Sequence, residues 1–295
     1  MKKVYLTEQL YYDVYENGKR TIYSPCKQLK DIQKVILNLI RINYNIRLNT
    51  KEAALVHTNQ KWLLKLDIKD FYNSISKELI VQAINKIYGS FSFAQDIKKD
   101  FIYKICTLDN KLPTGAVTSA HLANIAFDLT QIDEKLLDYC KQEGINYSRY
   151  MDDIFFSCNS KEKLNKVEKL TTNLLKEAGF SANSEKTKYI SNNKRQEVLG
   201  LAVNNSAVVP IESKRKYRAV FFNYLKAVYL EERLGVGSLF LKKVGYKEVC
   251  GYLAYIKNTD YKFYTLMQKF IISKINKFGI NENKEIKKLK KVVQK

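Results

Sequence analysis

The sequence contains few of the residues that interrupt regular structure. Among 295 residues there are 3 Pro and 11 Gly, and no stretch is rich in Ser or Gly. Flexible linkers are therefore not expected, and the chain should form one domain or two to three subdomains that share a groove. Histidine is equally scarce, since His57 and His121 are the only two. A histidine-based metal site or a Ser-His-Asp triad is accordingly not expected.

The cysteines and the apolar residues do not form the patterns of zinc, disulfide-rich or membrane proteins. Five cysteines stand at positions 26, 106, 140, 158 and 250 without CxxC spacing, so we expect reduced thiols and no zinc site. A run of about 18 apolar residues, the length of a membrane-spanning helix, is absent. Met1-Lys2-Lys3 leads into a segment with Tyr, Glu and Asp instead of the apolar core of a signal peptide. These absences predict a soluble, cytoplasmic protein.

Positive charge, in contrast, is present in large excess. Lys and Arg number 51 against 30 Asp and Glu, and the formal net charge of +21 is typical of proteins that bind a polyanion, either nucleic acid or a membrane surface. After Pro210, twenty Lys or Arg face seven Asp or Glu. Aromatic residues such as Tyr217 and Tyr252 lie among them, and such helices suit binding along a nucleic-acid backbone. The tail at 287–291 would equally serve as a solvated helix face.

Two adjacent carboxylates, Asp152 and Asp153, stand in a polar break between segments that are otherwise apolar or aromatic. Neighbouring side chains of a strand point to opposite faces, so two Asp that act together must lie at a turn, which predicts a tight hairpin. Anions this close repel by roughly 1 kcal/mol in water, and a bound cation such as Mg²⁺ would keep both ionised. Alone, such a pair is more often two solvated turn residues.

Asp67 stands near the end of a second apolar segment, 62–68, that reads as a buried strand. A buried acid is costly unless it is paired or binds a ligand, so Asp67 is either a functional residue or half of a salt bridge. Other patterns predict further elements. They are a hairpin at Asn17-Gly18, helices over 29–42, 77–87, 94–106 and 162–178, an irregular segment over 43–60, a long helix capped by Thr118 or Ser119 and running to about Lys135, a hairpin at 198–205, and helices from 210 to the end.

Five short motifs follow one another in a specific order. They are Asp67 with aromatic residues four and five positions later, Leu-Pro-x-Gly at 112–115, Tyr-x-Asp-Asp at 150–153, Asn-x-x-Lys-Thr at 183–187 and Val-x-Gly-Leu at 198–201. Their order resembles motifs A to E of reverse transcriptases, and within that family the retron-type bacterial enzymes. The resemblance covers nearly the whole chain. It implies an α+β right-hand polymerase fold with an antiparallel palm sheet and a helical thumb, divided into fingers (1–60 and 77–112), palm (61–76 and 113–205) and thumb (206–295).

The resemblance also implies roles for individual residues. Asp67, Asp152 and Asp153 match the catalytic carboxylates, which hold two Mg²⁺ ions, with Mn²⁺ as a substitute, for in-line phosphoryl transfer. Lys186 matches the lysine that protonates or neutralises pyrophosphate, and Tyr72 matches the aromatic residue that excludes a 2′-hydroxyl. The remaining matches are Lys19, Arg20, Thr114 and Gly115 for dNTP binding, Val198, Leu199 and Gly200 for the primer grip, and Lys214, Arg215, Lys216 and Arg218 for nucleic acid.

Two positions and one short element depart from the retron-type pattern. Thr114 replaces a Gln that contacts the dNTP, Leu199 replaces the Thr of Val-Thr-Gly, and the Asn-Ala-x-x-His element survives as Ala53–His57. The expected function is an RNA-directed DNA polymerase that copies a cognate non-coding RNA into DNA in antiviral defence, with dNTPs as substrates and an effector protein as a further candidate partner, but no membrane. The alternatives are an abortive-infection or other defence-associated reverse transcriptase with protein priming or untemplated synthesis, and a non-catalytic RNA-binding scaffold. A nucleotide cyclase fits the basic C-terminal region less well, and no RNase H domain is expected.

Overall fold

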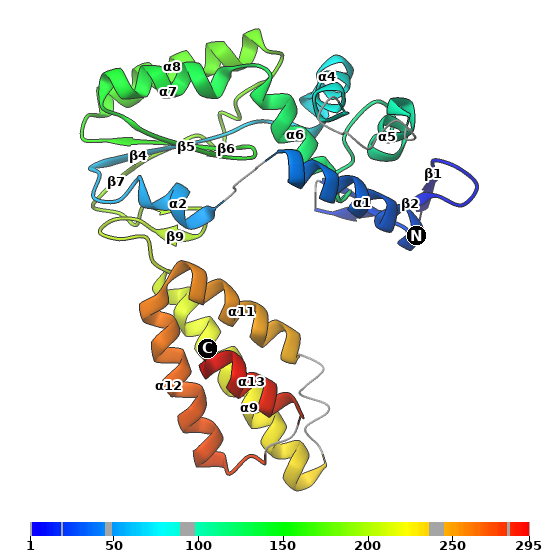
Figure 1. The fold of residues 1–295 in the computed structure, drawn as a ribbon. Coiled ribbons are helices and arrows are strands. Elements are labelled where there is room, and N and C mark those ends of the chain that lie inside the picture. Colours follow the sequence, from blue (N-terminus) through cyan, green and yellow to red (C-terminus); the bar gives the residue numbers. More distant parts are fainter. Residues whose placement is uncertain are drawn as a thin grey trace. The chain divides into compact units, whose positions relative to one another are not determined.

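A computed structural model of the chain describes residues 2–18, 20–44, 49–88, 98–235, 245–281 and 284–294. The chain divides into two compact units. Unit 1 consists of Met1–Asn49 and Gln60–Asn192, and unit 2 consists of Thr50–Asn59 and Asn193–Lys295. Each unit has its own hydrophobic core, and most of the elements of both are labelled in Figure 1.

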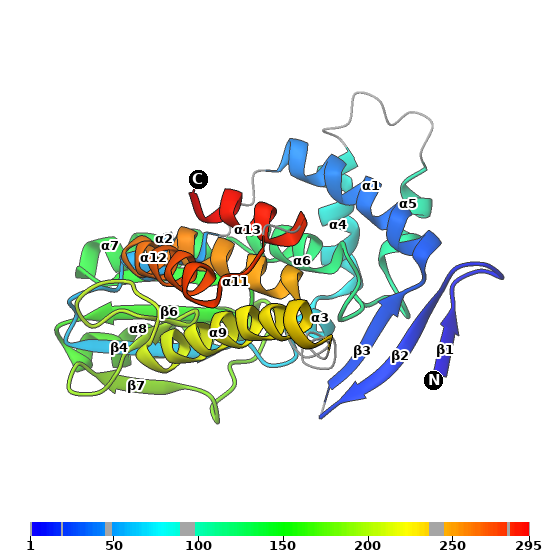
Figure 2. The ribbon, with the colours of Figure 1, turned by 90° about the horizontal axis from the view of Figure 1, so that it is seen from below.

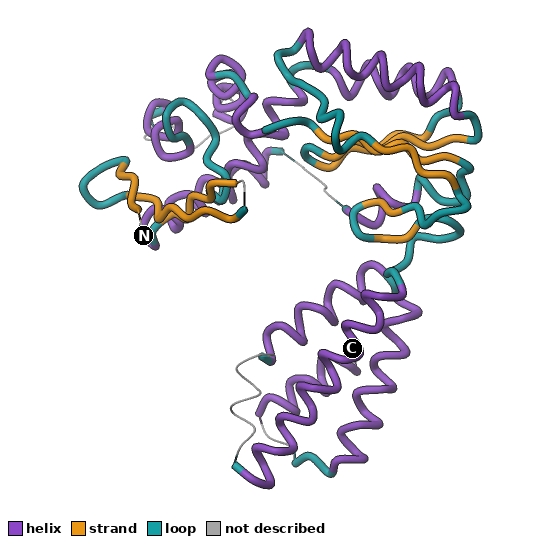
Figure 3. Tube along the Cα trace, turned by 180° about the vertical axis from the view of Figure 1, so that it is seen from behind, coloured by secondary structure: helices purple, strands orange, loops and turns teal. Residues whose placement is uncertain are grey.

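A four-stranded antiparallel sheet is the centre of unit 1. Its strands are β5 (Asn146–Tyr150), β6 (Asp153–Cys158), β4 (Trp62–Asp67) and β7 (Lys188–Ser191), in that order across the sheet. The two central strands, β6 and β4, carry the longest apolar runs, and most of their side chains are buried. Helices α7 (Ile132–Glu143) and α8 (Lys161–Glu177) cover one face of the sheet (Figures 1 and 3).

Three phenylalanines from separate segments form the core beside the ends of β4 and β6. Phe71 belongs to the short helix α3 (Phe71–Ser74), Phe127 to α6 (Ser119–Asp128), and Phe180 follows α8. Their ring centroids lie 5.4–6.1 Å apart, within the range of favourable aromatic contacts. This cluster fixes the segment that follows Asp67 against the helices of unit 1.

The N-terminal part of unit 1 is a three-stranded antiparallel sheet, which Figure 2 shows beside its helices. The strands are β1 (Lys2–Tyr5), β2 (Tyr11–Asn17) and β3 (Arg20–Pro25), and the helices are α1 (Lys27–Asn43), α4 (Lys77–Tyr88) and α5 (Lys99–Cys106). Gln33 of α1 is buried, and its amide donates to the Tyr12 hydroxyl and to Ile105 O and accepts from Val117 N. A satisfied buried amide thus joins a strand, two helices and the loop before α6.

Unit 2 is mainly helical. It contains α2 (Thr50–Leu55), a hairpin of β8 (Glu197–Val198) and β9 (Leu201–Ala202), and the helices α9 (Ile211–Leu234), α11 (Tyr246–Thr259), α12 (Tyr261–Phe278) and α13 (Lys284–Gln294). Residues such as Phe221, Leu253 and Met267 form its core. Asp260 caps α12 by accepting from Phe263 N, and it also accepts from Val209 N, which fastens the segment before α9 to the start of α12.

The α+β class, the antiparallel sheet and the helical C-terminal region are confirmed. The hairpins, the strand over 62–68 and the helices over 29–42, 77–87 and 162–178 are also confirmed within one to three residues. The helix expected over 94–106 begins at Lys99 in the described residues, and positions 94–97 lie outside them. None of the described helices is long and apolar enough to cross a membrane.

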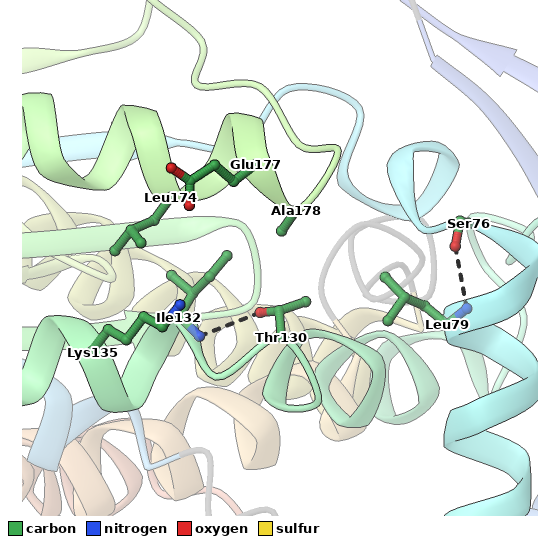
Figure 4. Close-up of a pocket in the computed structure, with 8 residues that line it drawn as sticks. All are labelled: Ser76, Leu79, Thr130, Ile132, Lys135, Leu174, Glu177 and Ala178. Carbon is green, nitrogen blue, oxygen red and sulfur yellow. Dashed lines mark hydrogen bonds between the residues drawn. The ribbon is translucent and has the colours of Figure 1, made fainter.

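The single long helix expected from position 119 to about Lys135 is wrong. The chain breaks after α6 and restarts at α7, with Gln131 in the left-handed region at φ 59°. The Thr130 hydroxyl donates to Phe127 O at 2.6 Å and accepts from Ile132 N at 3.4 Å, as Figure 4 shows for the second bond. A side chain that bonds to local backbone groups competes with the helix in this way.

Two smaller expectations also fail. Thr118 occupies the N-cap position of α6 without a side-chain bond to the helix, because it already has helical backbone angles. The Ser119 hydroxyl instead donates to Pro113 O at 2.8 Å. The segment 43–60, expected to be irregular, contains the six-residue helix α2, whose residues Glu52, Ala53 and Ala54 favour helix.

We predict that Phe180→Ala lowers the free energy of unfolding by about 3–5 kcal/mol, because it removes the ring that contacts both Phe71 and Phe127 and leaves a cavity. Phe180 is 1% exposed. Urea denaturation followed by circular dichroism measures the change. The matched control is Phe101→Ala, which removes a ring that is 45% exposed and should cost less than about 1 kcal/mol. Equal losses in the two variants would contradict this core.

Candidate active site

One pocket of unit 1 brings together residues that are distant in the sequence. Its volume is about 370 Å³. The residues singled out from the sequence that line it are Arg20, Asp67, Tyr72, Thr114, Asp152 and Lys186. They come from β3, β4, α3, the loop before α6, the β5–β6 turn and the turn before β7. The pocket therefore depends on the tertiary fold of unit 1 and not on any one segment.

Asp67 is the last residue of β4 and is 6% exposed. Lys186 Nζ lies 2.9 Å from Asp67 Oδ1 and 3.0 Å from Oδ2, and Asn183 Nδ2 donates to Oδ2 at 3.2 Å. The backbone N–H of Asn183 also donates to Asp67 O at 2.8 Å. A buried carboxylate is stabilised by such charge-assisted bonds. The turn that carries Lys186 is thus held against the end of β4.

The predicted hairpin is present, and it places Asp152 in its turn and Asp153 in the strand that follows. Tyr150 pairs with Asp153, so Met151 and Asp152 form a two-residue turn. Met151 has φ 56°, in the left-handed region. Asp152 lines the pocket, and its carbonyl accepts from Ile68 N at 2.9 Å. The turn is therefore attached to the residue that follows Asp67.

Asp153 begins β6 and stands directly opposite Asp67 in the antiparallel ladder. Its carboxylate forms an ion pair with Lys65, whose Nζ lies 2.8 Å from Oδ1. Lys65 and Asp67 are two residues apart on β4, so both side chains lie on the same face of the sheet. Of the three predicted carboxylates, Asp67 and Asp152 line the pocket while Asp153 is bound to Lys65.

Burial is the main cause that raises the pKa of Asp152, and the neighbouring carboxylates of Asp153 and Asp67 raise it further. Arg20 acts in the opposite direction on the same pKa. The pKa of Tyr72 is also raised, first by burial and then by the charge of Asp152. The pocket is thus a place where negative charge is costly until a cation approaches.

A divalent cation fits the oxygen atoms that Asp67 and Asp152 present to the pocket. Hard carboxylate oxygens are the ligands that Mg²⁺ and Mn²⁺ prefer. A cation would also offset the repulsion that raises the pKa of Asp152. In the described part of the chain, no group of three or more His, Cys, Asp or Glu is arranged to hold a metal. Two carboxylates leave most coordination positions to water or substrate.

The loop at Thr114 and Gly115 is fastened to the N-terminal sheet. Tyr23 N donates to Thr114 O at 2.8 Å. Gly115 has φ 106°, and a Cβ added there would lie 2.8 Å from Tyr23 O, so only glycine fits. This contact holds the loop beside β3, which begins with Arg20. Lys19 lies outside the described residues.

The predicted primer-grip residues lie in unit 2. Leu199 and Gly200 form the two-residue turn between β8 and β9, with φ 50° and 80°. Both positive angles are those of the tight turn that suits a β-hairpin. Val198 is fully buried, so its side chain holds the hairpin in place while the turn residues are more accessible.

The basic residues predicted to bind nucleic acid lie on the first turns of α9 in unit 2. Lys214 Nζ forms an ion pair with the buried Asp260 at 2.8 Å. Arg215, Lys216 and Arg218 are exposed. Three of the four cations are therefore accessible to a polyanion, while Lys214 is already bound within unit 2.

Sequence reasoning did not single out three residues that contact the site. Asn183 binds Asp67, Lys65 binds Asp153, and Arg149 donates to the carbonyl of Met151 in the aspartate turn. Lys65 and Arg149 did carry a signal, because each is a charged residue within a strand beside one of the aspartates. Asn183 belongs to the Asn-x-x-Lys-Thr motif, but its contact with Asp67 arises only in the folded chain.

Comparison with known proteins gives a consistent result. The family described as reverse transcriptase (RNA-dependent DNA polymerase) matches residues 13–203. The retron Ec83 reverse transcriptase of Escherichia coli is 26% identical over 94% of this chain and 90% of its own length. The retron Ec86 enzyme of the same organism is 26% identical over 90% and 80%. The retron Se72 enzyme of Salmonella heidelberg is 31% identical over 68% and 57%.

A solved telomerase of Candida albicans, in complex with a fragment of telomeric RNA, is 12% identical, with a TM-score of 0.48 over 96% of this chain and 60% of that one. At that score the likeness adds nothing to the assignment. The family match covers well over half of the 295 residues. Reverse transcriptases use divalent metal ions, in keeping with the oxygen atoms of Asp67 and Asp152. The chain belongs to the reverse transcriptase family and is an RNA-directed DNA polymerase of the retron type.

Proposed function

We propose that this polymerase copies a structured non-coding RNA into DNA at the pocket of unit 1, with dNTPs as substrates. The observation that carries the proposal is the meeting of Asp67, Asp152 and Lys186, from three separate segments, in one pocket. Arg20 and Tyr72 line the same pocket. Carboxylates that bind metal ions and a cation that stabilises the phosphates are groups that phosphoryl transfer uses.

Asp67 and Asp152 would hold two Mg²⁺ ions, with Mn²⁺ as a substitute. When bound, such ions supply Lewis-acid stabilisation to the attacking hydroxyl and to the pyrophosphate. Lys186 is 48% exposed and bound to Asp67, so its ammonium can reach the pocket without rearrangement of the backbone. From there it would neutralise or protonate the leaving pyrophosphate. Asp153 would stabilise the site from the strand, through its ion pair with Lys65.

The other lining residues suit nucleotide recognition. We assign Arg20, with Lys19, to the triphosphate, because a guanidinium binds phosphate oxygens in a bidentate manner. Tyr72 would lie against the sugar, where its ring excludes a 2′-hydroxyl. Thr114 offers a shorter side chain than the Gln that retron-type enzymes carry there. The contact of its loop with β3 through the backbone supports a role for Thr114 and Gly115 in shaping the pocket.

We assign the template and its DNA product to the hairpin at Val198–Gly200 and to the basic helices of unit 2, which would act as the thumb. We assign the fingers to 1–60 and 77–112 and the palm to 61–76 and 113–205. By these boundaries, Thr50–Asn59 of the fingers and 193–205 of the palm belong to unit 2. By the likeness to retron enzymes we place the protein in the bacterial cytoplasm, in antiviral defence, with an effector protein as partner.

We predict that Asp67→Asn and Asp152→Asn each lower the rate of dNTP incorporation on a primed RNA by about 10³-fold or more. Each replacement removes one negative oxygen ligand, and the loss of about 4 kcal/mol of transition-state stabilisation corresponds to that factor. The measurement is primer extension with Mg²⁺ and radiolabelled dNTPs. RNA affinity should stay within twofold of the original, because neither residue belongs to the basic helices.

The control for these variants is Asp138→Asn, which makes the same replacement at an exposed aspartate of α7. It should incorporate dNTPs at the original rate. Normal activity of Asp67→Asn and Asp152→Asn would end the catalytic assignment. A scaffold function would be favoured instead if the two variants retained the cellular phenotype of the protein after losing polymerase activity.

We predict that RNA affinity falls roughly 10³-fold between 50 and 200 mM salt, as expected when about six phosphates are neutralised. Replacing Arg215, Lys216 and Arg218 by Gln should reduce the slope of log affinity against log salt by about 2–3. Filter binding or fluorescence anisotropy measures both values. If the RNA affinity of the original protein did not change with salt, the assignment of unit 2 as the RNA-binding surface would be wrong.

The matched control for the triple variant changes Lys141, Lys169 and Lys176 to Gln. These lysines are exposed on α7 and α8 of unit 1, and the net charge falls by the same three units. The slope should remain unchanged. If this control lowered the slope as much as the α9 variant, the effect would reflect total charge and not a defined surface.

A further inference from the structure

Arg149 is a buried cation beside the aspartate turn. Its side chain, on β5, is 8% exposed and lies three residues before Asp152. A buried guanidinium is costly unless its donors are satisfied. All five of its N–H groups have acceptors. Nε donates to Asp133 Oδ1 and Oδ2 at 2.9 Å each, Nη1 to Asn124 Oδ1 at 2.9 Å and Met151 O at 3.1 Å, and Nη2 to Asp128 Oδ1 at 3.1 Å and Asp133 Oδ2 at 2.6 Å.

These acceptors come from three separate elements. Asn124 and Asp128 are one turn apart on α6, Asp133 lies in the first turn of α7, and Met151 is in the turn between β5 and β6. The guanidinium also packs on the ring of Phe127, with 4.2 Å between its carbon and the ring centroid. Arg149 therefore joins two helices of unit 1 to the backbone of the aspartate turn.

The break between α6 and α7 makes this arrangement possible. In an uninterrupted helix, Asp133 would lie five residues after Asp128 and roughly 140° around the axis from it. The two carboxylates would then face different directions. Because the chain restarts at Ile132, both carboxylates contact the same guanidinium. Asp133 also accepts from the Tyr147 hydroxyl.

The backbone of the aspartate turn needs such support. Met151 carries a side chain at φ 56°, a conformation that costs of order 1 kcal/mol or more and persists only where surrounding contacts impose it. Arg149 binds the carbonyl of Met151 on one side, and Ile68 N binds the carbonyl of Asp152 on the other. The direction of the Asp152 side chain follows from these two bonds.

We propose that Arg149 is a positioning residue for catalysis, which holds the Met151–Asp152 turn so that the Asp152 carboxylate faces Asp67 across the pocket. The proposal rests on the metal-binding role proposed above for Asp152. Arginine is required because a lysine has three donors on one nitrogen and cannot bind Asp133 and the Met151 carbonyl, which lie on different sides of the guanidinium. Arg149→Lys thus keeps the charge and loses the contact with the turn.

The test compares Arg149→Lys with the original protein in two assays. One measures kcat and the dNTP KM by primer extension on saturating primed RNA, and the other measures Mn²⁺ affinity without nucleic acid from the electron paramagnetic resonance signal of free Mn²⁺. Residues that orient a metal ligand typically contribute 10–100-fold to affinity or activity. We expect kcat and Mn²⁺ affinity each to fall within that range, while the dNTP KM changes less than about twofold. Asn124→Ala removes one of the two acceptors of Arg149 Nη1, so it should also lower kcat and Mn²⁺ affinity.

Two controls separate positioning from stability. Tyr147→Phe removes a different hydrogen bond to Asp133 and leaves Arg149 bonded to the turn. Leu136→Ala removes a fully buried side chain of α7. Both should lower the melting temperature and leave kcat and Mn²⁺ affinity within about twofold of the original. Arg149 is only structural if Arg149→Lys and Asn124→Ala keep kcat and Mn²⁺ affinity within about twofold of the original while they lose as much melting temperature as the controls.

Asp152→Asn in the same Mn²⁺ assay distinguishes the two possible failures. If Asp152→Asn binds Mn²⁺ as the original protein does, the proposed metal site is wrong. If Asp152→Asn loses Mn²⁺ binding while Arg149→Lys and Asn124→Ala keep it, the metal site stands and the positioning role of Arg149 is refuted.

Discussion

The antiparallel pairing of β4 with β6 is the constraint on which the site depends. Its register places Asp67 directly opposite Asp153. A shift of one residue would turn Leu64 and Leu66 of β4 out of the core of unit 1 and Lys65 into it, so burial of these two leucines fixes the register. The same register brings the β5–β6 turn to the end of β4, where Ile68 N binds the carbonyl of Asp152. The hydrophobic core thus determines where the carboxylates meet.

Like charges placed directly opposite in a ladder destabilise it, and here each aspartate of the pair has its own lysine. Lys186 binds Asp67 and Lys65 binds Asp153. The pKa of Asp152, the third acid, is raised by burial and by the other two carboxylates. Without metal, the protein therefore balances two of its three acids with side chains. The third retains an unfavourable charge that a metal ion would stabilise.

The sequence was sufficient for the strands and for the turn at Asp152, because apolar runs and turn residues are local signals. The meeting of Asp67 with Asp152 was expected only from the resemblance of the motifs to those of reverse transcriptases, and the fold brings both residues to one pocket. The sequence was insufficient for the contacts of Arg149. The side chains that accept from Arg149 lie 16 to 25 residues before it. Their convergence depends on a helix break that the apolar stripe of 119–135 does not predict. Thr130 and Gln131 make that break through local hydrogen bonds and one left-handed residue, which a periodicity argument does not register. The bonds from Asn183 and Lys186 to Asp67 are likewise products of tertiary structure.

Binding of metal ions by Asp67 and Asp152 is tested most directly by a crystal structure of the protein with primed RNA, a non-hydrolysable dNTP analogue and Mn²⁺, with anomalous scattering used to locate the manganese. We expect anomalous peaks about 2.1–2.2 Å from carboxylate oxygens of Asp67 and Asp152, with Lys186 displaced from Asp67 toward the phosphates. Manganese bound elsewhere, with Lys186 still paired to Asp67, would contradict a metal-dependent polymerase site in this pocket.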